Sequence, residues 1–340
     1  MSPSSALLLV PPDCPAPVPP ETVLLGLPMI RRTALAASRA GFSTVAVASA
    51  SDPVGRAVEG TGARLAGGQA APSDAVVLPW NRVLRTGEVR ELAAGRPARE
   101  LGIEVRARED LPRAERWLLD GLVKDTEGFM SRHFERKISL AVSRRLAATS
   151  ITPNQMTLVS VAIGLVGALF FLSSQAAFET VGALLFLLHS ILDGCDGELA
   201  RLKFQESRFG GVLDFWGDNV VHSAVFSAMA IGWSRAIGET WPLLLGALAV
   251  GGTLASAAFV YVRTMRAPKE GPLFTSVSAS ETPVSRVADA LSRRDFIYLV
   301  LALSLFGKAN WFLFLTAIGA PIFFIVLLAL DRRHAERKPA

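Results

Sequence analysis

The stretch from Asp193 to Asp218, DGCDGELARLKFQESRFGGVLDFWGD, decides how the chain is organised. It holds two pairs of carboxylates, Asp193 with Asp196 and Asp214 with Asp218, and each pair lies next to a long apolar segment. Charge is costly in such places, so these residues indicate a functional site. Residues three or four apart share one face of a helix. A helical hairpin that turns at residues 203–209 would therefore bring the two acidic faces together.

Composition divides the chain into a soluble part and a membrane part. Apolar residues make up 51% of the 340 residues and the mean hydropathy is +0.38, above an average soluble domain. The excess lies in the second half. The net charge of +5 gives no reason to expect a nucleic-acid partner. The basic residues cluster beside apolar segments, where anionic membrane lipids would meet them.

Residues 1–125 are predicted to form a cytoplasmic α/β domain with a small, Rossmann-like parallel sheet. Strands that alternate with helices are typical of such a sheet. Short apolar runs predict strands at 5–11, 43–49 and 75–80, with a fourth at 103–108, and helix-compatible runs lie at 29–40, 54–65 and 88–95.

Such domains often bind nucleotides, so a phosphate loop would be expected after the first strand. That strand leads instead into PPDCPAPVPP, residues 11–20, which lacks the glycines that let backbone amides approach a phosphate. The glycine-rich run GTGARL, residues 60–65, follows a helix rather than the first strand. We therefore interpret it as a turn in preference to a phosphate loop.

Residues 126–150 are predicted to form an amphipathic helix in which apolar residues such as Ile138 and Val142 alternate with basic residues such as Arg136 and Lys137. A helix of this kind fits the membrane interface. The alternative is a surface helix packed on the first domain. A membrane segment begins within ten residues, which favours the interfacial interpretation.

Residues 151–332 predict an all-α bundle of six transmembrane helices. Thr152-Pro153-Asn154 predicts the start of the first helix. Most of the apolar segments approach the ~20 residues that cross a bilayer. They lie near 156–172, 178–199, 211–233, 241–262, 296–307 and 311–330.

The distribution of basic residues predicts the orientation of these helices. Lysine and arginine are concentrated before the first helix, in the second-to-third and fourth-to-fifth connections, and in the basic tail at 333–340. By the positive-inside rule both termini and the acidic stretch face the cytoplasm, across the inner or plasma membrane. The outer connections hold only Arg235 and Lys308.

Four carboxylates so close together would repel one another unless cations neutralise them. Oxygen ligands suit Mg²⁺ or Mn²⁺, and two such ions would form the clamp used for displacement at phosphorus. Gly197, Ala200 and Gly210 leave room for a bulky group against the helices. Arg201 would pair with a phosphate or lock a carboxylate in place. Acids that are merely solvated helix ends are the alternative, which four evenly phased acids among glycines disfavour.

The same residues carry a resemblance to a known family. The run D-x2-D-G-x2-A-R-x8-G-x3-D-x3-D is the signature of the CDP-alcohol phosphotransferases, and the stretch from Asp193 to Asp218 fulfils it at all eight positions. The TPNQMT run at 152–157 also resembles the opening of the family's first membrane helix. The resemblance implies an interfacial helix, six membrane helices and a homodimer. It implies transfer of a phosphoryl-alcohol group from a CDP-alcohol to an acceptor hydroxyl, with release of CMP.

Roles for individual residues follow from the resemblance. Asp193, Asp196 and Asp214 would ligate the metal ions, and Asp218 would join them or act as general base on the acceptor hydroxyl. The donor would be CDP-diacylglycerol or a CDP-inositol-like compound, and the acceptor an alcohol or an inositol phosphate. The residues implied at the CDP site are Asn154, Gly197, Ala200, Arg201 and Gly210.

An α/β domain placed before such a membrane module is similar to the bifunctional di-myo-inositol-phosphate-phosphate synthases. There the first domain is a nucleotidyltransferase that makes a CDP-inositol. The present chain lacks that domain's glycine-rich loop after the first strand. We therefore expect a degenerate nucleotidyltransferase-like domain, kept for structure or regulation.

Other polar residues leave several interpretations open. His189 lies four residues before Asp193 and His222 four after Asp218. Each would contact the acceptor or substrate phosphate, orient an acid, or only hydrogen-bond within the bundle. Arg263 and Arg266 would bind an anionic acceptor or serve as positive-inside residues.

Two other functions compete with a transferase. A transporter whose acids bind and pass cations expects those acids near the bilayer midplane, whereas these lie at one end of their helices. A scaffold with an inert membrane anchor is disfavoured because all four acids are intact.

Overall fold

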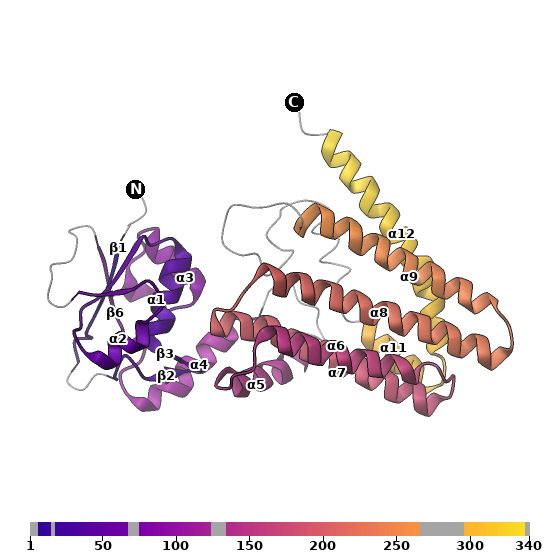
Figure 1. The fold of residues 1–340 in the computed structure, drawn as a ribbon, viewed down its shortest axis with the longest axis horizontal. Coiled ribbons are helices and arrows are strands. Elements are labelled where there is room, and N and C mark those ends of the chain that lie inside the picture. The colour runs from indigo at the N-terminus through magenta and orange to yellow at the C-terminus, as the bar shows by residue number, and fades with distance from the viewer. Residues whose placement is uncertain (1–5, 15–17, 67–74, 124–133, 266–295, 337–340) are drawn as a thin grey trace. The chain divides into compact units, whose positions relative to one another are not determined.

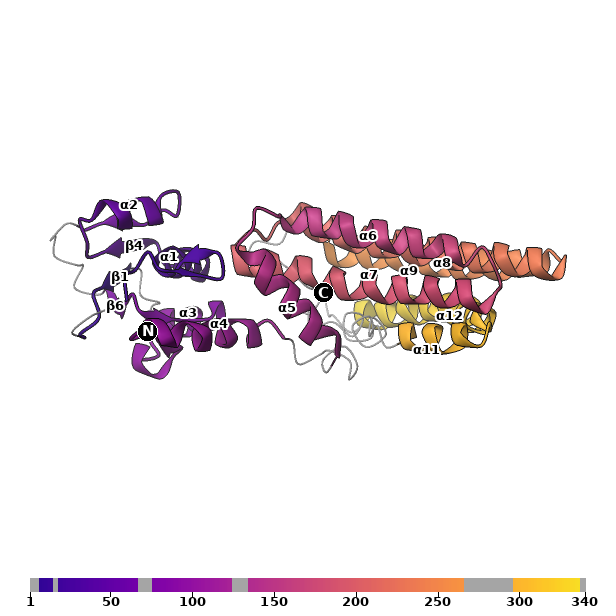
Figure 2. The same ribbon diagram turned by 90° about the horizontal axis from the view of Figure 1, so that it is seen from below.

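The computed structural model describes residues 6–14, 18–66, 75–123, 134–265 and 296–336. The chain divides into two compact units, one built on a sheet and one built from apolar helices (Figures 1 and 2). The first unit comprises Met1–Lys124, Arg144–Ser150 and Leu202–Phe204, and the second Asp125–Ser143, Ile151–Arg201 and Gln205–Ala340.

The first unit contains the predicted parallel α/β sheet. Its four strands have the order β5-β4-β1-β6, and β1 pairs in parallel with both β4 and β6. Leu7 and Leu9 of β1 are buried against Ile30 and Ala34 of α1, which places the core between sheet and helix. The elements are β1 (Ala6–Val10), α1 (Met29–Ala40), β4 (Thr44–Val47), α2 (Asp52–Val58), β5 (Arg64–Leu65), β6 (Val76–Pro79) and α3 (Thr86–Ala93).

The run at residues 60–65 forms a turn that leads into β5, as expected. Gly60 and Gly62 there have φ of +73° and +82°, which residues with a Cβ rarely adopt. Two further short strands, β2 (Val23–Leu24) and β3 (Leu27–Pro28), form an antiparallel pair of their own before α1.

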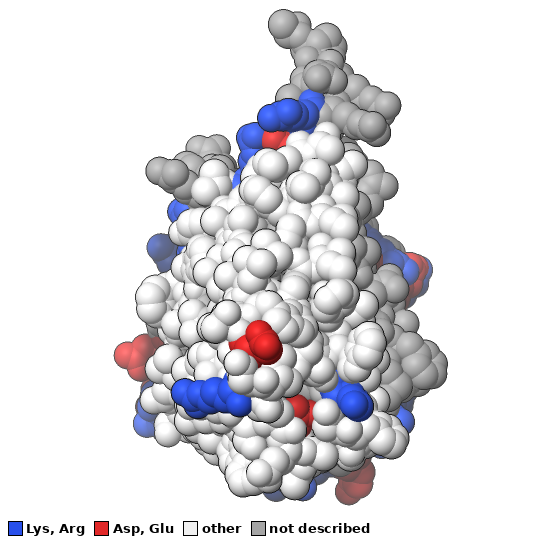
Figure 3. All heavy atoms as spheres, turned by 90° about the vertical axis from the view of Figure 1, so that its right-hand side faces the viewer, with Lys and Arg blue, Asp and Glu red and all other residues white. Residues whose placement is uncertain are grey.

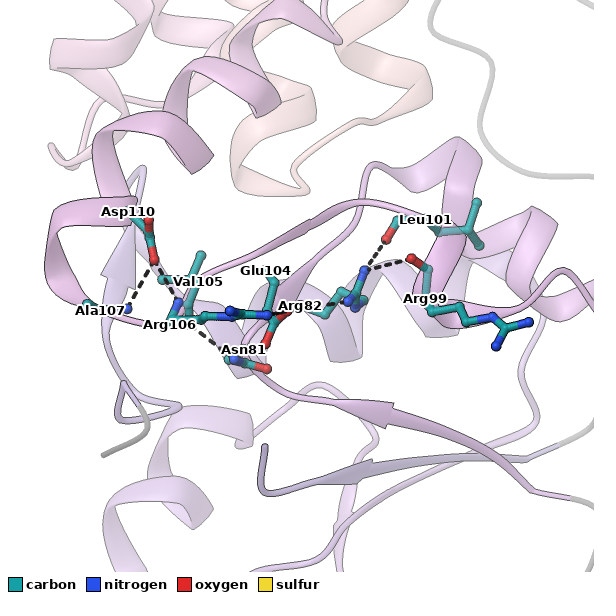
Figure 4. Close-up of polar contacts among 9 residues, drawn as sticks. All are labelled: Asn81, Arg82, Arg99, Leu101, Glu104, Val105, Arg106, Ala107 and Asp110. Atoms are coloured by element: carbon teal, nitrogen blue, oxygen red, sulfur yellow. Dashed lines mark hydrogen bonds and ion pairs between the residues drawn. The ribbon is translucent and has the colours of Figure 1, made fainter. Parts of the chain in front are cut away.

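The predicted fourth strand at 103–108 does not join this sheet. Only Ile103–Glu104 is a strand, β8, and it pairs antiparallel with β7 (Arg82–Val83) in a separate ribbon. Asn81 explains the difference, because it is buried and ties the two segments together from both sides (Figure 4). The side-chain amide of Asn81 donates to the backbone carbonyl of Val105 at 3.1 Å. The backbone N–H of Val105 in turn donates to the backbone carbonyl of Asn81 at 2.8 Å.

A polar loop follows β8 and ends the ribbon. The backbone N–H groups of Arg106 and Ala107 donate to one Asp110 carboxylate oxygen, at 2.9 and 3.1 Å (Figure 4). These two hydrogen bonds stabilise the charged form and hold the pKa of the Asp110 carboxyl below its ordinary value. The loop leads into α4 (Leu111–Asp120), which opens with a proline at its second residue.

The helix α5 (Arg136–Ala147) has an unusual division of its faces. Its buried side chains include Ser139 and Ser143, which are small and polar. Ile138, by contrast, is exposed to 39%. An ordinary surface helix buries its apolar stripe against the protein. Here the protein leaves an apolar side chain uncovered, which an interfacial helix would place against lipid.

The second unit consists of long apolar helices. In the described part of the chain five are long and apolar enough to cross a membrane, and α11 is a shorter apolar helix of ten residues, so the count of six remains a prediction. The bounds are α6 (Pro153–Phe170), α7 (Ala176–Lys203), α8 (Arg208–Ile237), α9 (Trp241–Val260), α11 (Phe296–Leu305) and α12 (Ala309–Glu336).

Large apolar side chains face outward from these helices. Leu158, Leu169 and Ile325 are each more than half exposed, as expected of surfaces that meet lipid tails. Figure 3 shows the side that lies at the right in Figure 1, where the surface is mostly uncharged, with few lysine or arginine side chains.

Local signals fix where the two helices next to the acidic stretch begin. Thr152 caps α6, since its hydroxyl accepts from the Gln155 N–H and the Gln155 side chain accepts from the Thr152 N–H. This confirms the helix start predicted at Thr152-Pro153-Asn154. Ser207 caps α8 by accepting from the Gly210 N–H at 3.0 Å.

Glycines allow the helices to pack closely. A Cβ on Gly167 of α6 would lie 2.9 Å from the Leu185 Cβ of α7, and one on Gly182 would lie 2.9 Å from the Gly167 carbonyl oxygen. Small residues at helix crossings are the usual means of close approach in membranes.

Two neighbouring glycines of α9 provide a matched test of this packing. A Cβ on Gly252 would lie 2.6 Å from the Pro321 nitrogen of α12, whereas one on Gly251 would meet nothing within 4 Å. Gly252→Ala should lower the free energy of unfolding by about 1–3 kcal/mol through overpacking. Gly251→Ala should leave it unchanged or raise it by up to ~1 kcal/mol through helix propensity. Thermal unfolding in detergent measures both, and equal effects would contradict the close contact.

Candidate active site

Three of the four predicted acids converge at the second unit's acidic stretch. Asp193 comes from α7 and Asp214 and Asp218 from α8, and one carboxylate oxygen of each lies within 4.8 Å of the others. Asp193 is buried, while Asp214 and Asp218 are partly exposed. A set of carboxylate oxygens at this spacing is a donor set that suits a hard divalent cation. The residues present therefore fit a Mg²⁺ or Mn²⁺ site.

The fourth acid, Asp196, is held differently. It is buried and accepts a hydrogen bond from the hydroxyl of Thr157 on α6. It lies outside the group of three mutually close oxygens among the described residues. Thr157 thus connects α6 directly to the signature segment of α7. The sequence contained a signal for it, because Thr157 closes the TPNQMT run, but nothing in the sequence alone paired it with Asp196.

His189 lies in the bundle behind Asp218. Its ring is buried, and Nδ1 lies 2.9 Å from the Ser160 carbonyl oxygen of α6. On the other side of the ring, Nε2 lies 3.5 Å from the Asp218 Oδ1. Gly164 makes room for this arrangement, because a Cβ there would lie 3.0 Å from the His189 Cγ. His189 is therefore buried within the bundle, between α6 and Asp218.

Residues expected around the donor lie along the two helix segments that frame the acids. The Arg201 guanidinium passes beside Gly197, with Nη1 3.6 Å from where a Cβ would be. A Cβ on Gly210 would lie 2.9 Å from the Asn154 Oδ1, so Gly210 provides the space in which the Asn154 side chain sits at the start of α8. Ala200 is buried one turn before the end of α7.

Among the remaining predicted residues, His222 and Arg263 contact residues other than the four acids. The His222 ring packs among Phe186, Phe226 and Phe296, with ring centroids 5.6, 6.3 and 5.7 Å away. Arg263 forms an ion pair with Asp331 of α12. Arg266 lies outside the described residues.

Comparison with known proteins identifies several relatives that match part of this chain. A bifunctional IPC transferase and DIPP synthase of Thermococcus kodakarensis is 42% identical over 123 residues, which are 36% of this chain and 27% of that protein. An archaetidylinositol phosphate synthase of Pyrococcus horikoshii is 30% identical over 110 residues, 32% of this chain and 56% of that protein. The matches span only 26% to 41% of the length of the four bifunctional relatives.

Among solved structures, the chain aligns with the phosphatidylinositol phosphate synthase of Mycobacterium tuberculosis with CDP-DAG bound. The TM-score is 0.41 at 18% identity, over 57% of this chain and 93% of that one. The sequence model of the CDP-alcohol phosphatidyltransferase family matches residues 150–330, more than half of the 340 residues and all of the acidic stretch. The chain therefore belongs to the CDP-alcohol phosphatidyltransferase family, whose members are transferases of substituted phosphate groups.

Proposed function

We propose that this protein transfers the phosphoryl-alcohol group of a CDP-alcohol to an acceptor hydroxyl, with CMP as the leaving group. The convergence of Asp193, Asp214 and Asp218 is the observation that carries the proposal. In the reaction the acceptor oxygen bonds to the donor's phosphorus, the bond from that phosphorus to the CMP oxygen breaks, and the hydroxyl proton goes to a base.

Asp218 is the proposed base. The buried His189 ring lies beside it, with Nε2 3.5 Å from the Asp218 Oδ1, and that ring is fixed by its contact with the Ser160 carbonyl. A base must be held in position to accept a proton efficiently. Asp193, Asp214 and Asp218 itself, with Asp196 nearby, would hold two Mg²⁺ or Mn²⁺ ions. When bound, these ions would neutralise the donor's diphosphate and orient it for in-line displacement.

The donor site is proposed at the neighbouring helix ends. Arg201 would pair with the diphosphate, and Gly197, Ala200 and Gly210 would leave space for the nucleotide beside Asn154. Several relatives bear inositol phosphate in their names, among them an archaetidylinositol phosphate synthase and phosphatidylinositol phosphate synthases. We therefore place an inositol phosphate first among the acceptors, with CDP-diacylglycerol and CDP-inositol as alternative donors.

The placement of the protein belongs to the proposal as well. The exposed Ile138 of α5 supports an interfacial helix, and the distribution of basic residues supports a cytoplasmic active site and cytoplasmic termini. The protein would work as a homodimer. The first unit would be a degenerate nucleotidyltransferase-like domain, because β1 is followed by a proline-rich run and not by a glycine-rich loop.

Release of CMP tests the function. Purified protein with Mg²⁺, CDP-diacylglycerol or CDP-inositol, and inositol phosphate or other alcohols should release CMP together with a phosphodiester that mass spectrometry detects. Asp214→Asn should lower kcat about a hundredfold or more, because a metal ligand is lost. Glu239→Gln, which changes an exposed acid just after α8, is the matched control. Cation flux in vesicles without CMP release from any donor would instead favour a transporter.

Two adjacent glycines at the start of α8 test the donor site. Gly210→Ala would place a methyl group 2.9 Å from the Asn154 Oδ1 and displace that side chain. We expect the KM for the CDP-alcohol to rise about tenfold, since small displacements at a binding site have effects of this size. A Cβ on Gly211 would be 3.8 Å from the nearest atom, the Met265 Cε, so Gly211→Ala should stay within about twofold. A KM that is unchanged in Gly210→Ala would remove Asn154 from the donor site.

A further inference from the structure

The signature segment of α7 has a second face that the proposed chemistry does not use. The residues in the variable gaps of the signature, Gly194, Cys195 and Glu198, turn toward α5. A Cβ on Gly194 would lie 3.1 Å from the Arg136 Nη1, and the Cys195 thiol lies 3.5 Å from the Ser139 carbonyl oxygen. All three lie within one helical turn of Asp193 or Asp196 on the same rigid helix.

Glu198 is the centre of this contact. Its side chain is fully buried, and one carboxylate oxygen accepts from the Arg136 Nη1 at 2.6 Å and from the Ser139 hydroxyl at 2.7 Å. The Arg136 side chain is itself only 16% exposed. Gly194 allows this geometry, since a larger residue there would meet the guanidinium on its way to Glu198.

A buried ion pair of this kind contributes little to stability compared with well-packed apolar residues, because both charges lose their hydration. What it provides is a defined position, since a buried charge tolerates only the arrangement that keeps its partners. The small Ser139 and Ser143 add close packing without adding apolar surface. The contact therefore fixes the register and rotation of α7 against α5 at the level of the acids.

We infer that Arg136 and Glu198 are positioning residues, which set the orientation of α7 so that Asp193 and Asp196 reach their places in the site. Glu198 lies outside the group of converging carboxylates among the described residues, so it acts through the helix and not on the substrate. The expected effect on kcat rests on the proposed function. The expected effect on metal affinity can be measured without any turnover.

The experiment uses the full-length protein with Cys14→Ser, so that the buried Cys195 is the single thiol at the contact between α5 and α7. Glu198→Gln and Arg136→Met break the pair, Arg136→Lys keeps the positive charge, and Lys137→Met removes the exposed neighbouring charge of α5 as a control. The rate at which maleimide labels Cys195 measures how closely α5 packs over this buried thiol. Electron paramagnetic resonance reports the dissociation constant for Mn²⁺, and CMP release gives kcat and the donor KM.

In Glu198→Gln and Arg136→Met, Cys195 should be labelled at least about tenfold faster and the dissociation constant for Mn²⁺ should rise about tenfold. The kcat should fall about ten- to a hundredfold, while the donor KM should change less than about threefold. Arg136→Lys should recover most of the Mn²⁺ affinity, and Lys137→Met should match the unmutated protein. Where Glu198→Gln does not fold, Ser139→Ala removes one donor to Glu198 and should weaken Mn²⁺ binding to a smaller degree.

Faster labelling with unchanged Mn²⁺ affinity and unchanged kcat would overturn the inference, because α5 would then only pack against α7. Unchanged labelling and affinity would overturn it as well. Failure of the unmutated protein to release CMP while the variants still lose Mn²⁺ affinity would count against the proposed function and leave the positioning role supported.

Discussion

The second unit depends on keeping three carboxylates close together at the end of apolar helices. Oxygens of Asp193, Asp214 and Asp218 lie within 4.8 Å of one another. At an effective dielectric constant of about 20, each pair of like charges at this distance is unfavourable by roughly 3–4 kcal/mol. No ordinary stability requirement would select such a cluster. A cation-binding site explains the cluster, because bound Mg²⁺ or Mn²⁺ would offset the repulsion and use the same carboxylates as ligands.

The rest of the helical unit holds these acids against their repulsion. Two residues of α6 make such contacts. Thr157 donates a hydrogen bond to Asp196, and the Ser160 carbonyl fixes the ring of His189 behind Asp218. Glycines make this possible. Gly164 leaves space for His189, and a Cβ on Gly217, next to Asp218, would lie 2.7 Å from the Val161 Cγ2 of α6. On its other face α7 is tied to α5 through Glu198. The signature helix is therefore fixed from two sides.

Sequence patterns predicted the elements well where one strong local signal acted alone. The helix at Met29–Ala40 has the predicted bounds, and the capping residues Thr152 and Pro153 start α6 as expected. The spacing of the aspartates predicted that both pairs face one another, which holds for Asp193, Asp214 and Asp218.

Features that depend on a partner distant in the sequence could not be predicted in the same way. The segment at 103–108 has a strand-like composition, but Asn81 directs its first two residues into another ribbon. The spacing of the acids gave no signal for the hydrogen bond that Asp196 accepts from Thr157, 39 residues earlier. Glu198 looks like a solvated acid until the position of Arg136, 62 residues earlier, is known. In each case a side chain's role depends on which helix or strand packs beside it.

The central claim is that the three converging carboxylates hold divalent metal for chemistry on a CDP-alcohol. An experimental structure with Mn²⁺ and CDP-diacylglycerol, recorded at the manganese absorption edge, tests it most directly. The account predicts anomalous peaks within ~2.2 Å of carboxylate oxygens of Asp193, Asp214 and Asp218, with the donor's diphosphate in contact with them. Manganese bound elsewhere, or a CDP-alcohol bound away from these acids, would contradict it.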